Sequence, residues 1–149
     1  MSAPAHRALV DPGRPAVVGA GSSRQPTCGQ LDERSRSLAA WFAEVGLRHG
    51  DHIALVLPDR VDYLVAAWAA RRAGLHYTPV DVHLTATELR YVIEECGAAV
   101  VVGSAGLIAL FDVSTGRVLW WTFDDPATTG WERPTGAACG DLGPGARRV

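Results

Sequence analysis

The residues with the clearest potential for chemistry form a short turn, His49-Gly50-Asp51-His52, directly before an apolar run. Imidazole and carboxylate groups at this spacing suggest a metal clip, because both are common zinc ligands. A structural zinc site needs four protein ligands, and no further His or Cys lies nearby in the sequence to complete the shell. We therefore interpret this segment as a solvated turn and expect no metal-ligating residue in it.

Two other small motifs suggest enzyme sites. Gly19-Ala20-Gly21 follows a short apolar run, as a dinucleotide-binding turn would, but the third glycine is missing and Arg24-Gln25-Pro26 stands where a helix should begin. Ser22, Ser104 and Ser114 each lie near a glycine, yet none is in a Gly-x-Ser-x-Gly elbow. The sequence therefore predicts a plain turn at 19–21 and offers no anchor for a hydrolase nucleophile.

Composition restricts the chemistry further. The 149 residues are 48% hydrophobic and 20% charged, which is typical of one globular domain, and a net charge of -2 argues against nucleic acid as a partner. All 14 basic residues are arginine, so the chain contains no lysine. Any mechanism that needs a lysine, as a phosphate clamp or as an amine nucleophile, is excluded within this chain.

Cysteine usage and hydropathy indicate a compartment. Cys28, Cys96 and Cys139 are odd in number and widely separated, which fits a reducing cytoplasm better than a disulfide framework. The N-terminus lacks the pattern of a secretory signal, and the longest uncharged run, 97–111, is shorter than a membrane span. We expect a cytoplasmic protein without a transmembrane segment.

The elements that must position any site are read from caps and periodicity. Thr27 and Gln30 have capping-box spacing, and an apolar stripe ends at Gly46, which predicts a helix over 28–45. A second helix begins after Asp59, its predicted cap, and ends at Gly74. A third helix follows the capping-box pair of Thr85 and Glu88 and ends at Gly97. Trp41 and Trp68 fall on or beside the helix stripes and are interpreted as core residues.

Apolar runs between these helices predict strands. The run 53–57 is bounded by turn residues and Pro58, the pattern of a central strand covered on both faces. Shorter runs at 16–18, 77–80 and 98–102 predict further strands, with Pro79 unable to donate to a full ladder. Strands joined by helices require crossover connections, so we predict an α/β fold with a mostly parallel sheet and flanking helices.

The pattern weakens after residue 103. The runs 107–111 and 117–123 flank a glycine-containing turn and predict two more strands, whereas 124–149 has no periodicity. We therefore divide the chain into an N-terminal α/β part, 1–103, and a weakly structured or divergent segment, 104–149.

The stretch from Thr27 to Val102 resembles the adenylate-forming enzymes, specifically the fatty-acyl-CoA ligases (acyl-CoA synthetases). The resemblance rests on the order of Gly50-Asp51, a buried strand ending in Pro58, a helix ending in Ala73-Gly74, then Tyr77-Thr78-Pro79-Val80-Asp81 and Leu84-Thr85-Ala86-Thr87-Glu88-Leu89. It implies the N-terminal part of the large domain of an AMP-binding enzyme. Family members use ATP, Mg²⁺ and coenzyme A to convert a carboxylic acid to an acyl-adenylate and then to acyl-CoA.

The same resemblance brings out one further segment, Thr128-Thr129-Gly130-Trp131-Glu132-Arg133-Pro134-Thr135-Gly136, which is similar to the family's phosphate loop. Three residues rather than one separate Gly130 from Pro134, and Thr135 stands where the family has lysine. Backbone amides can cradle a phosphate without lysine, but the cation is missing. We interpret this segment as a loop of coincidental composition, and predict no catalytic, cofactor-binding or metal-binding residue and no cofactor bound by this chain itself.

Three functional hypotheses follow. The leading one is a truncated fatty-acid-CoA ligase that is inactive alone, because the phosphate loop and catalytic lysine of the family are missing. The alternative is a non-catalytic interaction module that docks onto a full-length ligase or a separately encoded remainder, since apolar faces left uncovered bind partners. A third is an independent Rossmann-like nucleotide binder.

Overall fold

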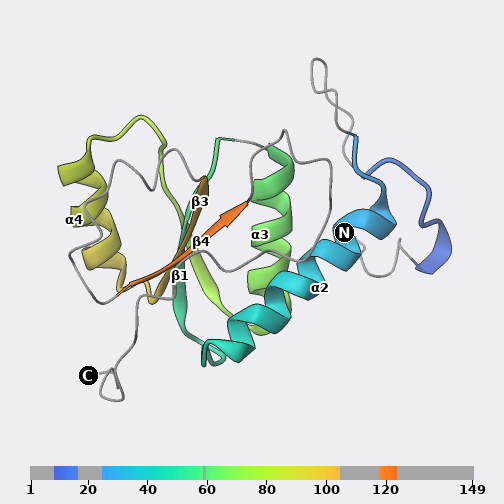
Figure 1. Cartoon of the computed structure of the whole chain (residues 1–149), viewed down its shortest axis with the longest axis horizontal. Helices are drawn as coiled ribbons and strands as arrows, with labels where there is room; N and C mark the ends of the chain where they lie inside the picture. Colours follow the sequence, from blue (N-terminus) through green and yellow to red (C-terminus); the bar gives the residue numbers. More distant parts are fainter. Residues whose placement is uncertain (1–8, 17–24, 59, 105–117, 124–149) are drawn as a thin grey trace.

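The structure is a computed structural model, and it describes residues 9–16, 25–58, 60–104 and 118–123. Within these ranges the elements follow the order α2 (Cys28–Glu44), β1 (His52–Val56), α3 (Arg60–Ala73), β2 (His76–Pro79), α4 (Ala86–Cys96), β3 (Val100–Ser104) and β4 (Leu119–Phe123). Figure 1 shows a sheet with α2 and α3 on one side and α4 on the other. The predicted α/β architecture is confirmed.

The four described strands form one parallel sheet in the order β2-β1-β3-β4. β1 is central, as the continuous apolar run predicted, and Ile53 pairs with Tyr77 on one side and Val100 on the other. The connection through α3 leads to β2 on one side of β1, and the connection through α4 crosses back to β3 on the other. This reversal creates a topological switch point between β1 and β3.

Local signals set the ends of α2. The Thr27 hydroxyl accepts a hydrogen bond from Gln30 N–H (3.2 Å), and the Gln30 side chain accepts one from Thr27 N–H (3.0 Å), which completes the predicted capping box. At the other end Gly46 has φ 87°, and Leu47 N–H donates to Phe42 O (2.9 Å). This six-to-one bond is that of a Schellman motif, so the helix stops where the glycine predicts.

The other two helices also begin and end close to their predicted positions. The Thr85 hydroxyl accepts from Glu88 N–H at the start of α4, and Gly97 ends that helix in the left-handed conformation. Helix α3 ends before Gly74, as predicted. Its predicted cap, Asp59, lies outside the described residues.

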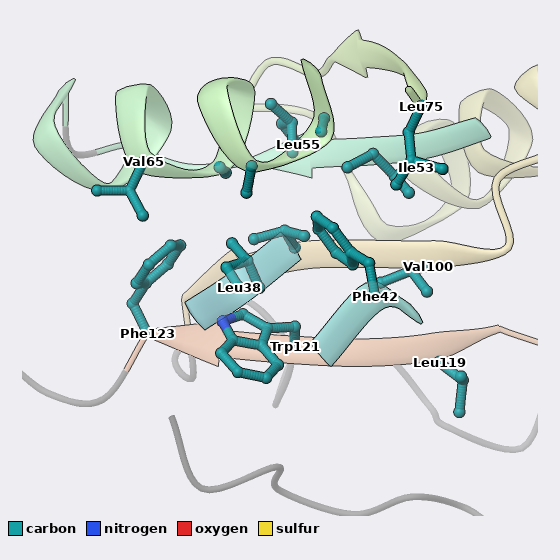
Figure 2. Close-up of a cluster of buried hydrophobic side chains, with 14 of the residues drawn as sticks. Leu38, Phe42, Ile53, Leu55, Val65, Leu75, Val100, Leu119, Trp121 and Phe123 are labelled. Carbon is teal, nitrogen blue, oxygen red and sulfur yellow. The ribbon is translucent and has the colours of Figure 1, made fainter. Parts of the chain in front are cut away.

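The sheet separates two apolar clusters, whose residues alternate along the central strands β1 and β3. Figure 2 shows the larger cluster, where α2 and α3 cover one face of the sheet. Its fully buried large side chains include Leu38, Phe42, Ile53, Leu55, Val65, Val100, Val102 and Trp121. The smaller cluster lies under α4 and consists of Ala54, Val56, Val80, Leu89, Ile93, Ala98 and Val101. Burial on both faces explains why the central strands have unbroken apolar sequences.

Strand β2 forms one end of the described sheet. Val80 N–H donates to Leu55 O (2.8 Å), and three of the four residues of β2 are exposed. Pro79 alternates with the residues whose amides face β1, so its missing N–H costs the ladder no hydrogen bond. Among the described strands β2 therefore lies at an edge, and Pro79 fits there without the amide donor that the sequence showed it to lack.

The part of the chain beyond residue 103 contributes β4, which pairs with β3 along its whole length, from Val100–Leu119 to Ser104–Phe123. The strand predicted at 117–123 is thus found as β4. The predicted strand 107–111 and the tail 124–149 lie outside the described residues, as do residues 17 and 18 of the first predicted strand. Ala16 N–H, just before that gap, donates to Pro26 O (2.8 Å). The division after residue 103 stays a prediction.

Gly74 closes the turn from α3 to β2 and is expected to tolerate no side chain. Its φ is +69°, and an added Cβ would lie 2.2 Å from Cδ2 of His49. Gly74→Ala combines left-handed strain of about 1–2 kcal/mol with displacement of the imidazole. Gly46→Ala is the matched control, since Gly46 has φ +87° and open space around it. Urea unfolding should show a larger loss in the free energy of unfolding for Gly74→Ala than for Gly46→Ala. Adding His49→Ala to Gly74→Ala should remove the difference between the two variants. Equal losses at both glycines would show that the close approach costs nothing.

Candidate functional site

The predicted solvated turn His49-Gly50-Asp51-His52 joins α2 to β1 at the amino ends of the strands. His49 is exposed and its ring lies against Gly74. Gly50 N–H donates to Gly74 O (2.8 Å), and the Asp51 carboxylate accepts from Arg48 N–H (2.7 Å). The turn is therefore held by its own backbone and by the neighbouring turn from α3.

The structure adds a residue pair that sequence spacing did not predict. Register places His52 of β1 directly opposite His76 of β2, with ring centroids 5.9 Å apart. Nε2 of His52 lies 2.7 Å from the hydroxyl oxygen of Thr78, also on β2. The two histidines are 24 positions apart in the sequence, so only the pairing register brings them together.

The carboxyl ends of the strands surround the switch point, where ligands of open α/β sheets bind. Ser104 ends β3 and pairs with Phe123 of β4, and the guanidinium of Arg34 lies over the Phe123 ring, 5.4 Å from its centroid. Arg34 also forms a 3.3 Å ion pair with Asp62 in the first turn of α3. Of the three serines considered as nucleophiles from the sequence, Ser104 alone lies in the described residues, and those at 22 and 114 do not. The segments 19–21 and 128–136 also lie outside the described residues.

The two tryptophans interpreted as core residues both pack against the larger cluster. Trp41 contacts Trp121 with ring centroids 4.3 Å apart, and Trp68 has the Arg71 guanidinium 5.4 Å from its ring centroid. Both side chains are partly buried. Both therefore pack against the core, as predicted, and Trp41 does so between α2 and β4.

A polar network between α2 and α3 was missed at the sequence level. The Asp32 carboxylate forms ion pairs with Arg72 of α3 and with Arg36 one turn further along α2 (2.9 Å). The Arg72 Nε–H donates to the fully buried Ser35 hydroxyl (3.1 Å), which in turn donates to Asp32 O (3.0 Å). Asp32 and Ser35, at spacing i, i+3, interrupt the otherwise apolar buried face of α2. Two polar residues on such a face are a signal in the sequence for a buried polar network.

Among the described residues, the pKa values of Tyr63, Asp81 and Glu88 are shifted, each by a local cause. Burial raises the pKa of the Tyr63 phenol, and its neighbour Tyr77 adds to the shift. A hydrogen bond from His83 N–H, followed by one from the His83 ring, lowers the pKa of Asp81. The Thr85 N–H and hydroxyl lower the pKa of Glu88. The two carboxylates are exposed and belong to a turn and a helix cap.

Two observations bear on the binding of metal ions and phosphates. Within ranges 9–16, 25–58, 60–104 and 118–123, no group of three or more His, Cys, Asp or Glu side chains is placed to hold a metal ion. The whole sequence lacks lysine, so no ammonium can neutralise a triphosphate.

None of the described helices combines the length and apolar character needed to cross a bilayer.

Comparisons with known proteins agree with this fold. The profile of the AMP-binding enzyme family matches residues 5–133. A long-chain-fatty-acid–CoA ligase of Salmonella typhimurium is 36% identical over 90 residues, which cover 60% of this chain and 16% of that protein. A 4-hydroxybenzoate–CoA/benzoate–CoA ligase of Rhodopseudomonas palustris is 30% identical over 89 residues, again 60% of this chain and 16% of the relative.

Solved structures support the same placement. The N-terminal domain of FACL13 from Mycobacterium tuberculosis superposes with a TM-score of 0.70 at 23% identity, covering 93% of this chain and 38% of that one. This shows a shared fold. The chain spans only 16% of the length of the two curated ligases above. It belongs to the AMP-binding enzyme family and matches the N-terminal part of the family's fatty-acyl-CoA ligases.

Proposed function

We propose that this segment is the N-terminal scaffold of a fatty-acyl-CoA ligase and does not form an acyl-adenylate by itself. The observation that carries the proposal is a well-packed parallel sheet combined with a complete absence of lysine. Adenylate formation releases pyrophosphate, and cations must stabilise the charge on the phosphates as the bond to the leaving group breaks. Arginine can pair with phosphate, but Arg34, Arg36 and Arg72 are already engaged in ion pairs between or along the helices.

The described side chains support a scaffolding role because the interior is apolar and its polar groups are used in packing. Asp32 and Ser35 are buried, and both bind Arg72. The switch point at the carboxyl ends of β1 and β3 is where the fold would present a ligand to other residues of a ligase. The segment therefore positions a site and supplies few of its reacting groups.

The substrate class proposed for such a ligase is a carboxylic acid. A relative named for long-chain fatty acids is 36% identical over 90 residues, and one named for benzoate is 30% identical over 89 residues. Fatty acids are the better first choice because identity to the fatty-acid enzyme is higher.

An activity assay tests the proposal. The purified chain, incubated with ATP, Mg²⁺, hydroxylamine and either palmitate or benzoate, is expected to give no acyl-hydroxamate above a no-protein blank. The full-length Salmonella typhimurium ligase is the positive control. Two results together would overturn the proposal: hydroxamate formation that rises in proportion to the amount of chain, and elution of this activity with the chain on gel filtration.

The position of β4 favours a second candidate function, an interaction module. Within the described residues β4 pairs with β3 alone, so one of its edges lacks a strand partner there. An open edge is a ready site for another strand. Sedimentation of the chain alone and mixed with a purified long-chain-fatty-acid–CoA ligase tests this function. A new, faster species in the mixture supports docking, and a chain that sediments as a monomer in both experiments contradicts it.

A further inference from the structure

The imidazoles of His52 and His76 form a cross-strand pair at the amino ends of β1 and β2. The two residues are registered directly opposite each other, so their side chains leave the same face of the sheet. Alternation with Ala54 and Val56, which pack in the cluster under α4, assigns that face to the α4 side. His76 is exposed and His52 is partly buried, so solvent reaches the pair.

The spacing of the two rings suits a shared metal ion. A metal–nitrogen bond of about 2.0–2.1 Å plus roughly 1.2 Å from ring nitrogen to centroid puts two ligating imidazoles about 5.2 Å apart at a tetrahedral angle and about 6.4 Å apart when opposed. The observed separation of 5.9 Å between the His52 and His76 centroids lies within this interval.

A second contact holds the His52 ring against β2. Nε2 of His52 lies 2.7 Å from Thr78 Oγ1. The tautomer in which Nε2–H donates to this oxygen leaves the Nδ1 lone pair to bind metal. Metal-ligating histidines almost always donate their other N–H to an oxygen in this way, which orients the ring and makes the ligand more basic.

We propose that His52 and His76 bind a late first-row divalent transition-metal ion on the surface of the sheet, with Thr78 orienting His52. Two protein ligands leave the remaining positions to water, so the site is open and exchangeable. Imidazole suits Ni²⁺, Cu²⁺ and Zn²⁺, whereas Mg²⁺ and Ca²⁺ prefer oxygen ligands. The site is therefore distinct from any Mg²⁺ requirement of adenylate chemistry, and it does not depend on the function proposed above.

The test is calorimetric titration of the untagged full chain with Ni²⁺ at neutral pH. Ni²⁺ is the probe because the chain also carries cysteines, which favour softer ions. One equivalent is expected to bind and to raise the melting temperature by mass action. His76→Gln removes an exposed ligand and should abolish saturable binding, while Thr78→Val should weaken binding by about 10-fold or more.

His83→Gln is the matched control, because His83 is also exposed and lies 2.8 Å from the Asp81 carboxylate, a rival place for a cation. Its affinity for Ni²⁺ should equal that of the unchanged chain. Failure to saturate at millimolar Ni²⁺, undiminished binding in His76→Gln, or an equal loss in His83→Gln would each overturn the proposal. Circular dichroism of each variant confirms that any loss of binding comes from a folded chain.

Discussion

Replacing Trp121 by alanine is expected to lower the free energy of unfolding by about 3–5 kcal/mol, the usual cost of truncating a large buried aromatic residue. Trp121 is 1% exposed and lies in the larger cluster (Figure 2). Its ring packs against that of Trp41 of α2. The loss would be a large share of the roughly 5–15 kcal/mol that stabilises a domain. Urea unfolding curves, compared at equal m-values, give this difference directly.

The same side chain carries a polar defect, which makes a second variant informative. Among the buried side-chain nitrogen and oxygen atoms of the described residues, Trp121 Nε1 lacks a hydrogen-bond partner. An unsatisfied buried donor costs about 1–3 kcal/mol. Trp121→Phe removes that donor together with some packing volume, so these two effects oppose each other. We expect Trp121→Phe to cost much less than Trp121→Ala.

Trp68→Ala is the matched control for the alanine variant. Trp68 is only partly buried, and its ring faces Arg71 on the same helix. Folding removes less of the Trp68 side chain from water. Trp68→Ala should therefore lower the free energy of unfolding clearly less than Trp121→Ala does. If Trp121→Ala and Trp68→Ala cost the same, β4 is not an integral part of the folded core.

The features that sequence predicted well are those fixed by neighbours within four residues. The capping boxes at Thr27 and Thr85 and the terminal glycines at 46 and 97 each need only an i, i+3 relation or a positive φ. Such signals act locally and survive any tertiary arrangement. The helices therefore begin and end close to the predicted residues.

Relations between distant segments were not accessible in the same way. The parallel direction of the strands followed from the length of the crossovers, but their order and register did not. The pairing of His52 with His76 depends on that register. A shift of one residue would turn one of the two rings to the other face of the sheet. The candidate metal site therefore emerges only from the three-dimensional structure.

The contact between α2 and α3 gives another relation of this kind and leads to the second prediction. Asp32 and Arg72 are 40 positions apart, and their ion pair lies at the interface of the two helices. The Asp32 side chain is 10% exposed and that of Arg72 is 23% exposed. The pair is thus screened less than a surface ion pair but more than a fully buried one.

Asp32→Ala is expected to lower the free energy of unfolding by about 2–3 kcal/mol, somewhat below the roughly 3–5 kcal/mol found when a fully buried pair loses one partner. The variant leaves Arg72 with the Ser35 hydroxyl as its remaining hydrogen-bond acceptor in this network, while Arg36, whose side chain is 59% exposed, can turn to water. Glu33→Ala, at the exposed neighbouring position, is the matched control and should change stability by less than about 0.5 kcal/mol.

A double-mutant cycle separates the ion pair from the packing of the helices. Combining Asp32→Leu with Arg72→Met replaces both charges by apolar groups, and such replacements are often neutral or stabilising in interiors. The double variant should therefore be more stable than either single variant, with a coupling energy of about 1–3 kcal/mol measured by urea unfolding. Strictly additive losses would mean that the two charges act independently, and that α2 and α3 are held together by the apolar cluster alone.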